Sequence, residues 1–418
     1  VHRATERARA ELDPGSRAPA LAALIDAYPT EQRAAVAREV LEATEGQFVL
    51  DMEDVLRKVG PYLDETDQFR ALTSVARVDA ESRQSRLAAL APFLFPALLP
   101  RAIAIARTID DDEAALLVGA ALAPQLDADD LRALMDWMPR VANDYVLARA
   151  VAAVLPHLTE AALPAARTVI EGITWDTSLA QVALPALAAR LTGPERNATL
   201  KKAVEVAAAM DDPDRLVWAF QAFVSQLSAR QIKDVVEILD TSLVRQSEYP
   251  ECRVQLLAAA AAHAGKKLRP SLVSRAFALV KQLTDDEKRS EALCALAEVL
   301  DDDERATAMT HADDIANAFE KAEVYAALAA TALEPQNAHD MAMLAVQQVE
   351  YFMESQVFST NEQAEIIGSR ALPYVSPSAQ KEALNLIASF DDRALSARAL
   401  ANITPRLASE LLPRAIEI

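Results

Sequence analysis

One short phrase recurs along this chain of 418 residues and constrains its fold more than any other feature. The phrase is a small or apolar stretch, often containing proline, that closes on leucine, as in ALAPFL (89–94), ALAPQL (121–126) and AVLPHL (153–158). Successive closing residues are 31, 32, 32, 33 and 36 positions apart: Leu63, Leu94, Leu126, Leu158, Leu191 and Leu227. A period of about 33 residues is typical of helical repeats, whose hairpins must stack to bury their apolar faces.

A second phrase lies between these closures. LPRAIAI (99–105) returns as LPAARTV (163–169) and as LPRAIEI (412–418). Each repeat is therefore predicted to contain a helix A, a turn and a helix B. The last copy stops where the first continues into ARTIDDDE, which is typical of a piece cut from a longer array.

Alignment of the repeats on the closing residue predicts one buried stripe on helix B. The positions four, seven and eight residues before closure are small or apolar, as at Val154, Val151 and Ala150. Spacings of three and four residues place such side chains on one helix face. The position nine before closure mixes Arg149 with Trp218, so we expect it at the edge of the buried face.

Composition agrees with an all-α fold. The chain has only 8 glycines and 5% aromatic residues, which disfavours β-sandwiches, β-barrels and glycine-rich nucleotide sites. We therefore predict a right-handed α-solenoid of about ten stacked helical hairpins, similar to TPR or HEAT arrays. It would form a single array over 1–418, clearest at 60–418. Longer connections at 240–254 and 350–362 are interpreted as longer helices or local bends, with a functional insert as the alternative.

The net charge of −20, from 62 acidic and 42 basic residues, limits the partners. It disfavours nucleic acid and anionic membrane surfaces, and it favours a protein partner with a basic surface. No apolar run reaches about 18 residues, so no membrane span is expected. Two cysteines without a disulfide framework and a charged amino-terminal segment favour a cytoplasmic location.

Acidic runs are the most prominent feature that suggests chemistry. They stand at 110–113, 211–214, 284–287, 301–304 and 391–392. The run at 301–304 precedes a helix A, and the other four precede a helix B. We therefore interpret all five as helix caps. The alternative is a Mg²⁺-dependent α-helical diphosphate enzyme, which needs carboxylates converging on one cavity.

Other catalytic patterns are missing from the sequence. His311 with Asp313 and Asp314 is the one local group that resembles a metal site, without an HExxH or CxxC motif. AGKKL (264–268) fails the P-loop pattern, and no GxSxG occurs. We therefore expect no catalytic residues, no metal and no cofactor.

Aromatic side chains are the best candidates for recognition, because buried aromatics anchor protein interfaces. The candidate protein-binding residues are Trp137, Trp175, Trp218, Tyr351, Phe352 and Phe358. The alternative is that the tryptophans fill space between alanine-rich helices.

The stretch LPRAIAIARTIDDDEAALLVGAALAPQL resembles the Ala- and Leu-rich helical repeats that follow the NTPase module in bacterial STAND proteins of the NACHT and NB-ARC type. The resemblance covers most of 60–418 and concerns the repeat pattern only, because Walker motifs are missing. It implies a sensor arm that binds a foreign or regulatory protein and is fused to, or associates with, an NTPase or effector module.

The sequence thus predicts a non-enzymatic, protein-binding α-solenoid, acting as a sensor or scaffold in bacterial signalling or defence. Besides the diphosphate enzyme, one further alternative is a helical substrate or adaptor that is cleaved during signalling.

Overall fold

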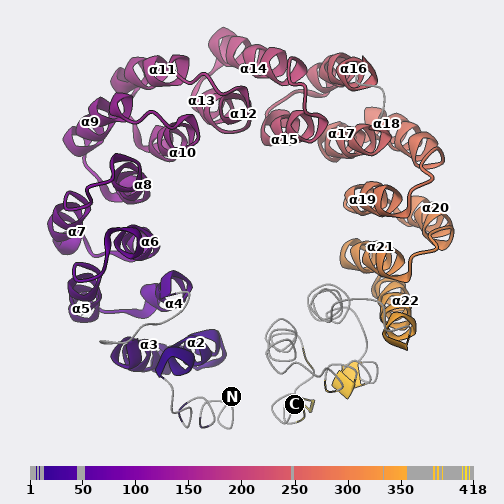
Figure 1. Ribbon diagram of the computed structural model, residues 1–418. Helices are drawn as coiled ribbons and strands as arrows, with labels where there is room; N and C mark the ends of the chain where they lie inside the picture. Colours follow the sequence, from indigo (N-terminus) through magenta and orange to yellow (C-terminus); the bar gives the residue numbers. More distant parts are fainter. Residues whose placement is uncertain are drawn as a thin grey trace. The chain divides into compact units, whose positions relative to one another are not determined.

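The computed structural model describes residues 14–44, 52–245, 249–332 and 334–354, with isolated positions nearer both ends. All regular structure within these residues is helical. The chain divides into two compact units, residues 1–206 and 207–418. The described residues of each unit form an α-solenoid of stacked helical hairpins, which confirms the predicted fold class (Figure 1).

In the first unit, B helices line the concave side and A helices the convex side (Figure 1). The A helices are α3 (Thr30–Thr44), α5 (Glu65–Val75), α7 (Leu99–Ala106), α9 (Ala128–Trp137), α11 (Leu163–Glu171) and α14 (Gly193–Ala208). The B helices are α2 (Pro14–Ala23), α4 (Met52–Val59), α6 (Ala80–Leu90), α8 (Asp112–Leu122) and α10 (Asp144–Val154). The last B element joins α12 (Asp176–Ser178), the π-helix η9 (Leu179–Ala183) and α13 (Leu184–Arg190).

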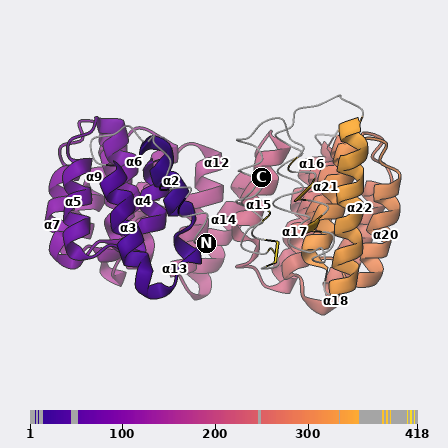
Figure 2. The ribbon, with the colours of Figure 1, turned by 90° about the horizontal axis from the view of Figure 1, so that it is seen from below.

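The second unit repeats this arrangement with longer helices. Its B helices are α15 (Pro213–Val224), α17 (Pro250–His263), α19 (Asp286–Ala297) and α21 (Ala318–Thr331). Its A helices are α16 (Ala229–Arg245), α18 (Gly265–Val280), α20 (Asp302–Asp313) and α22 (Pro335–Glu354). Seen from below, the helices of each unit stand side by side (Figure 2), and successive B helices pack directly on one another.

The predicted stripe on helix B is buried. The side chains four residues before closure are at most 5% exposed in each described repeat: Leu122, Val154, Leu187, Phe223, Leu296 and Ala329. Small residues eight before closure, such as Ala150, Ala219 and Ala292, are fully buried. Alanine here lets the stacked backbones approach closely. The copies of the phrases at 370–375, 402–407 and 412–418 lie outside the described residues.

The proline of the closing phrase ends helix B in a 3₁₀ turn. Such turns are η2 (Gly60–Tyr62), η3 (Ala91–Phe93), η5 (Ala123–Gln125) and η7 (Leu155–His157), each with proline in the middle. The closing leucine follows in extended conformation, and its N–H donates to the first carbonyl of the turn, as from Leu158 to Leu155 at 3.3 Å. Proline lacks the N–H that would continue the helix, so this phrase sets the point at which the chain turns.

One glycine marks a close approach between helices. A Cβ added to Gly119 of α8 would lie 2.6 Å from Cδ1 of Leu134 on α9. The Leu134 side chain of α9 fills the space beside Gly119. This explains why glycine stands here, seven residues before closure, where most repeats carry a larger side chain. Gly193 and Gly265, which begin α14 and α18, have φ of 57° and 70°, a conformation that glycine adopts without strain.

The acidic runs cap helices, as the sequence predicts. The side chains of Asp111, Asp212, Asp285 and Asp301 each accept a backbone N–H in the first turn of α8, α15, α19 and α20. A carboxylate at this position satisfies free N–H groups and interacts favourably with the helix dipole. The pair at 391–392 lies outside the described residues.

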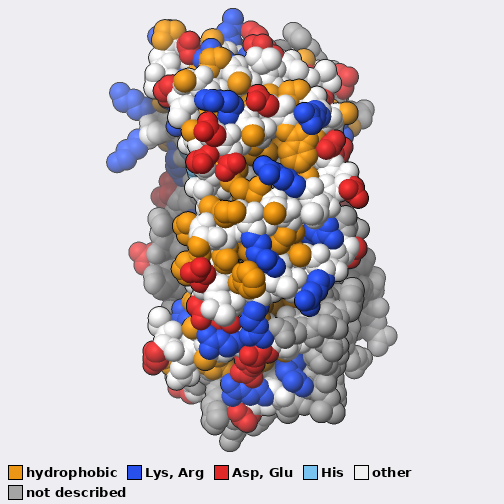
Figure 3. Space-filling view, turned by 90° about the vertical axis from the view of Figure 1, so that its left-hand side faces the viewer, with side chains coloured by type: hydrophobic (Ala, Val, Ile, Leu, Met, Phe, Trp, Pro, Cys, Tyr) orange, Lys and Arg blue, Asp and Glu red, His pale blue; other side chains and the backbone are white. Residues whose placement is uncertain are grey.

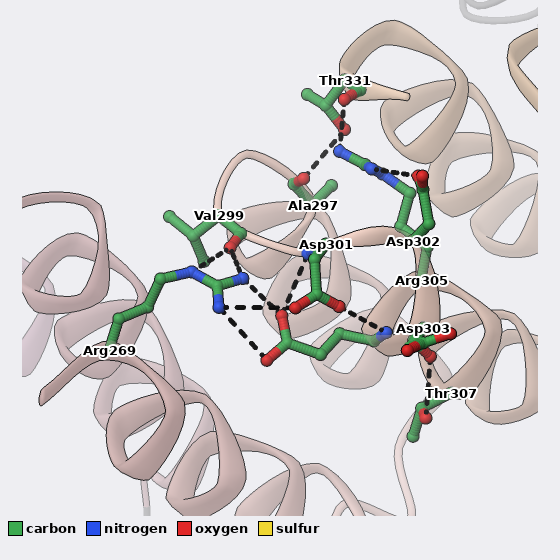
Figure 4. Close-up of polar contacts among 10 residues, drawn as sticks. Arg269, Ala297, Val299, Asp301, Asp302, Asp303, Arg305, Thr307 and Thr331 are labelled. Carbon is green, nitrogen blue, oxygen red and sulfur yellow. Dashed lines mark hydrogen bonds and ion pairs between the residues drawn. The ribbon is translucent and has the colours of Figure 1, made fainter. Parts of the chain in front are cut away.

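The cap of α20 also connects neighbouring A helices (Figure 4). Asp301 Oδ1 accepts from Glu304 N at 3.0 Å, and Glu304 Oε2 accepts from Asp301 N at 3.0 Å. The Arg269 guanidinium of α18 donates to Glu304 and lies 3.7 Å from Asp301 Oδ2. In the first unit, Arg38 of α3 contacts the cap residue and third residue of α5 in the same way.

Removal of the Asp301 carboxylate should destabilise the start of α20. We expect Asp301→Ala to lower the free energy of unfolding by about 1 kcal/mol, whereas Asp301→Asn should retain most of the cap. Hydrogen exchange at residues 302–304, with urea unfolding of the full chain, measures both effects. Equal exchange rates in the two variants would show that Asp301 does not act as a cap.

Residues 240–245 belong to α16 and residues 250–254 to α17, so most of the connection at 240–254 is longer helix. Asp240 links α16 to the two helices that follow, because Arg253 Nε of α17 donates to Asp240 Oδ1 at 2.6 Å and Arg275 of α18 lies 3.1 Å from Oδ2. Of 350–362, the first five residues belong to α22 and the rest lies outside the described residues.

Over the described part of the chain, no helix has the length and apolar character to cross a bilayer.

Candidate protein-binding surface

Two aromatic rings from neighbouring repeats meet at the amino-terminal edge of the B layer in the first unit. The rings of Tyr145 and Trp175 lie 6.3 Å apart, centroid to centroid, in an edge-to-face arrangement at 61°. Both remain exposed, at 46% for Tyr145 and 43% for Trp175. Arg149, one helical turn after Tyr145, places its guanidinium carbon 5.6 Å from the Tyr145 ring centroid. Tyrosine, tryptophan and arginine are the residues that most often dominate binding energy at protein interfaces.

A carboxylate holds this pair in place. Asp144 is the first residue of α10, and its Oδ2 accepts from Thr174 N at 2.9 Å, Thr174 Oγ1 at 2.7 Å and Trp175 N at 2.7 Å. The hydroxyl of Thr174 and the two backbone N–H groups lower the pKa of Asp144 below its ordinary value, although partial burial opposes this. The backbone that carries Trp175 is therefore fixed to the preceding repeat.

The helix after Trp175 is irregular. Residues 179–183 form a π-turn, and Pro185 follows as the second residue of α13. Proline removes a helical hydrogen bond and crowds the carbonyl four residues earlier, here that of Gln181, and a π-turn widens the helix there. Ser178 Oγ and Gln181 Nε2 are buried without a hydrogen-bond partner. This repeat thus departs from regular helix directly beside the aromatic pair.

Trp137 lines a groove on the convex side of the first unit. The groove, about 440 Å³ in volume, lies among α7, α8 and α9, and its lining mixes apolar residues such as Ile103 and Leu134 with charged ones such as Arg107. The Trp137 Nε1 group donates to Asp112 Oδ1 at 3.3 Å. Figure 3 shows this side of the unit, where hydrophobic patches alternate with lysine, arginine and acidic side chains. Trp137 is half-buried, so it contributes to packing as well as to the groove.

Trp218 is the one remaining predicted residue whose side chain the structure describes. Trp218 lies on α15 of the second unit and is 56% exposed. Tyr351 and Phe352 belong to the end of α22, where side chains are not described, and Phe358 lies outside the described residues. The position nine before closure is exposed at Arg149, Trp218 and Glu291 and fully buried at Val324.

The group around His311 is engaged in other contacts. The His311 ring stacks on Phe277, with centroids 5.8 Å apart, and burial lowers the pKa of His311. Asp313 Oδ1 accepts from the Tyr325 hydroxyl at 2.5 Å. Among the residues that the structure describes, no three His, Cys, Asp or Glu side chains converge as they would around a metal ion.

Comparison with known proteins finds a likeness to solved structures, two of which are described below. No protein-family model matches the chain, and no curated protein matches it. A crystal structure of Kap121p bound to Nup53p matches at 13% identity with a TM-score of 0.37, and one of Kap121p bound to Ste12p at 12% with a TM-score of 0.34. Each match covers 98% of this chain and 53% of the other, so the chain spans about half the length of these structures.

The sequence suggested Trp175 as a candidate and did not point to its neighbours Tyr145, Arg149 and Asp144, although one recurring feature connects them. Aspartate recurs immediately after the cap residue at Asp112, Asp144 and Asp286. Asp286 Oδ2 accepts from the backbone N–H groups of the turn at 316–317, both at 2.9 Å, just as Asp144 binds the turn at 174–175. In these two repeats, the aspartate after the cap residue therefore ties its helix to the next repeat.

Proposed function

We propose that this chain is a non-enzymatic α-solenoid that binds a partner protein through exposed side chains of its B helices. The exposed Tyr145–Trp175 pair carries the proposal. Two large rings at 46% and 43% exposure leave apolar area open to solvent, and the backbone of Trp175 is already fixed by Asp144. A partner that covers them would gain apolar burial without the entropic cost of ordering the site.

The test is capture of partner proteins on the immobilised full chain. We expect at least one protein to lose about tenfold in recovery with a Tyr145→Ala/Trp175→Ala variant, a loss typical of interface hot spots. Phe69→Ala is the matched control, because Phe69 is 46% exposed and lies on the A helix α5. If recovery of every protein is unchanged while the chain turns over a small molecule, the proposal fails.

We propose further that the chain serves as a sensor or scaffold in bacterial signalling or defence, in association with an NTPase or effector module. The support is the resemblance of its repeats to those that follow the NTPase module in STAND proteins. Co-purification with a chain that carries Walker motifs would support this role. A captured set without such a chain would argue for a free-standing scaffold.

A further inference from the structure

The B helices of the second unit carry acidic side chains near their amino-terminal ends. We call these residues the acidic face: Asp214, Glu251, Glu287, Glu291, Glu320 and Glu323. They stand in the amino-terminal halves of α15, α17, α19 and α21, which pack on one another in that order. The positions that hold Tyr145 and Arg149 in α10, two and six residues after the cap, hold Glu287 and Glu291 in α19.

The carboxylates of this face disfavour one another's charge. Although Glu291 is exposed overall, partial desolvation of its carboxylate raises its pKa, and so do the negative charges of Glu287, Asp214 and Glu251. The pKa of Glu320 is raised by burial and by the neighbouring acidic residues, although a hydrogen bond with Ser290 opposes this. A nearby cation has the opposite effect, and Lys288 offsets only part of the repulsion at Glu291.

One lysine of the chain shows how this face holds a cation. Lys288 Nζ lies 3.0 Å from Glu251 Oε1 and 5.7 Å from the centroid of the Tyr249 ring. Carboxylate and aromatic ring together form a good site for an ammonium or guanidinium group. Lys288 satisfies only one oxygen of Glu251. Glu251 is 6% exposed, and its buried Oε2 has no hydrogen-bond partner.

A large exposed aromatic ring lies in the same helix layer. Trp218 stands six residues after the cap of α15, the position that holds Glu291 in α19 and Glu323 in α21. It is 56% exposed, and Tyr249, the cap residue of α17, is 40% exposed. Tryptophan is the aromatic residue that attracts cations most strongly.

We infer that the acidic face, together with Trp218 and Tyr249, binds a segment of a partner protein that carries lysine or arginine side chains. The inference rests on the proposed protein-binding function and names the partner's chemistry. Basic side chains would neutralise Glu287 and Glu291 and pack on the exposed rings.

The experiment measures binding of a short fluorescein-labelled peptide of alternating lysine and serine to the full chain, by anisotropy at about 0.15 M salt. We expect Glu287→Gln/Glu291→Gln to raise Kd about tenfold and Trp218→Ala to raise it severalfold. The matched control is Asp129→Asn/Glu160→Gln in the first unit, which removes equal charge from side chains that are 91% and 83% exposed. A peptide of alternating glutamate and serine should not bind.

Three outcomes would overturn the inference. They are no binding of the lysine peptide, an unchanged Kd in the Glu287→Gln/Glu291→Gln variant, or equal weakening in the control, which would mean that only net charge matters. None of them affects the proposed function, which is tested by the Tyr145→Ala/Trp175→Ala variant. If a captured partner depends on the Tyr145–Trp175 pair and not on the acidic face, the proposed protein-binding function stands and the inference of a basic partner segment fails. Thermal melts of all variants establish that each is folded.

Discussion

Replacement of Phe220 by alanine should remove about 3–5 kcal/mol from the free energy of unfolding of the second unit. Phe220 is fully buried in α15, and its ring packs edge-to-face against Phe223 with centroids 5.7 Å apart. Leu216 and Val217 of the same helix are also fully buried, so the space left by the ring would be lined by side chains that are already packed. Such a cavity costs more than the lost transfer free energy alone.

The matched control lies two residues away. Trp218→Ala removes a larger side chain from the same helix, but Trp218 is 56% exposed and should cost less than about 1 kcal/mol. Urea unfolding followed by circular dichroism compares the variants. Because repeat arrays are stabilised mainly by nearest neighbours, hydrogen exchange in α15 and α17 localises the loss. Similar losses in both variants would mean that Phe220 is not part of a tightly packed core.

The burial of Phe220 could be predicted from the sequence because it depends on local spacing. It stands seven residues before the closing Leu227, the position held by Val151 and Leu293 in other repeats. All three are fully buried. The closing phrase was equally informative, since proline acts on the backbone of its own helix. Features that repeat with the period of the chain therefore give the helices, their buried faces and their ends.

Contacts between repeats are less accessible to this reasoning. The position nine before closure holds Trp218 in one repeat and Val324 in another, and the structure exposes the first and buries the second. The exposure depends on neighbouring helices about thirty residues away, which local spacing does not encode. The candidate site is predicted in the same partial way. Trp175 was a candidate because it is a tryptophan. Its contacts with Tyr145 and with the carboxylate that fixes it depend on how α10 packs against the next repeat, which local spacing does not predict.

Replacement of Asp144 by alanine should lower the free energy of unfolding of the first unit by about 1–2 kcal/mol, and it should weaken partner capture as well. The Asp144 carboxylate accepts three hydrogen bonds from Thr174 and Trp175. Hydrogen bonds to a charged group contribute about 1.5–3 kcal/mol each when buried, and exposure to solvent reduces that figure. Without them the turn at 174–175 is no longer tied to α10, so the Trp175 ring loses its fixed position.

The pH dependence of this effect has a definite sign. The pKa of Asp144 in the folded chain is lowered, first by the Thr174 hydroxyl, so its contribution is fully present above its unfolded pKa of about 3.9. It is lost as pH falls through the lower, folded pKa. The difference in unfolding free energy between wild type and Asp144→Ala should therefore be constant from about pH 5 to pH 8 and shrink below about pH 4.

Urea titrations at several pH values measure this difference. Asp129→Ala is the control, because the Asp129 side chain is 91% exposed and should show little effect at any pH. Asp144→Asn separates charge from geometry, since an amide oxygen can still accept a hydrogen bond but without the strength of a carboxylate. If the difference in unfolding free energy between wild type and Asp144→Ala grows as pH falls below about 4, the charged carboxylate of Asp144 opposes folding. Trp175 would then be held by its ring contact with Tyr145 rather than by the preceding repeat.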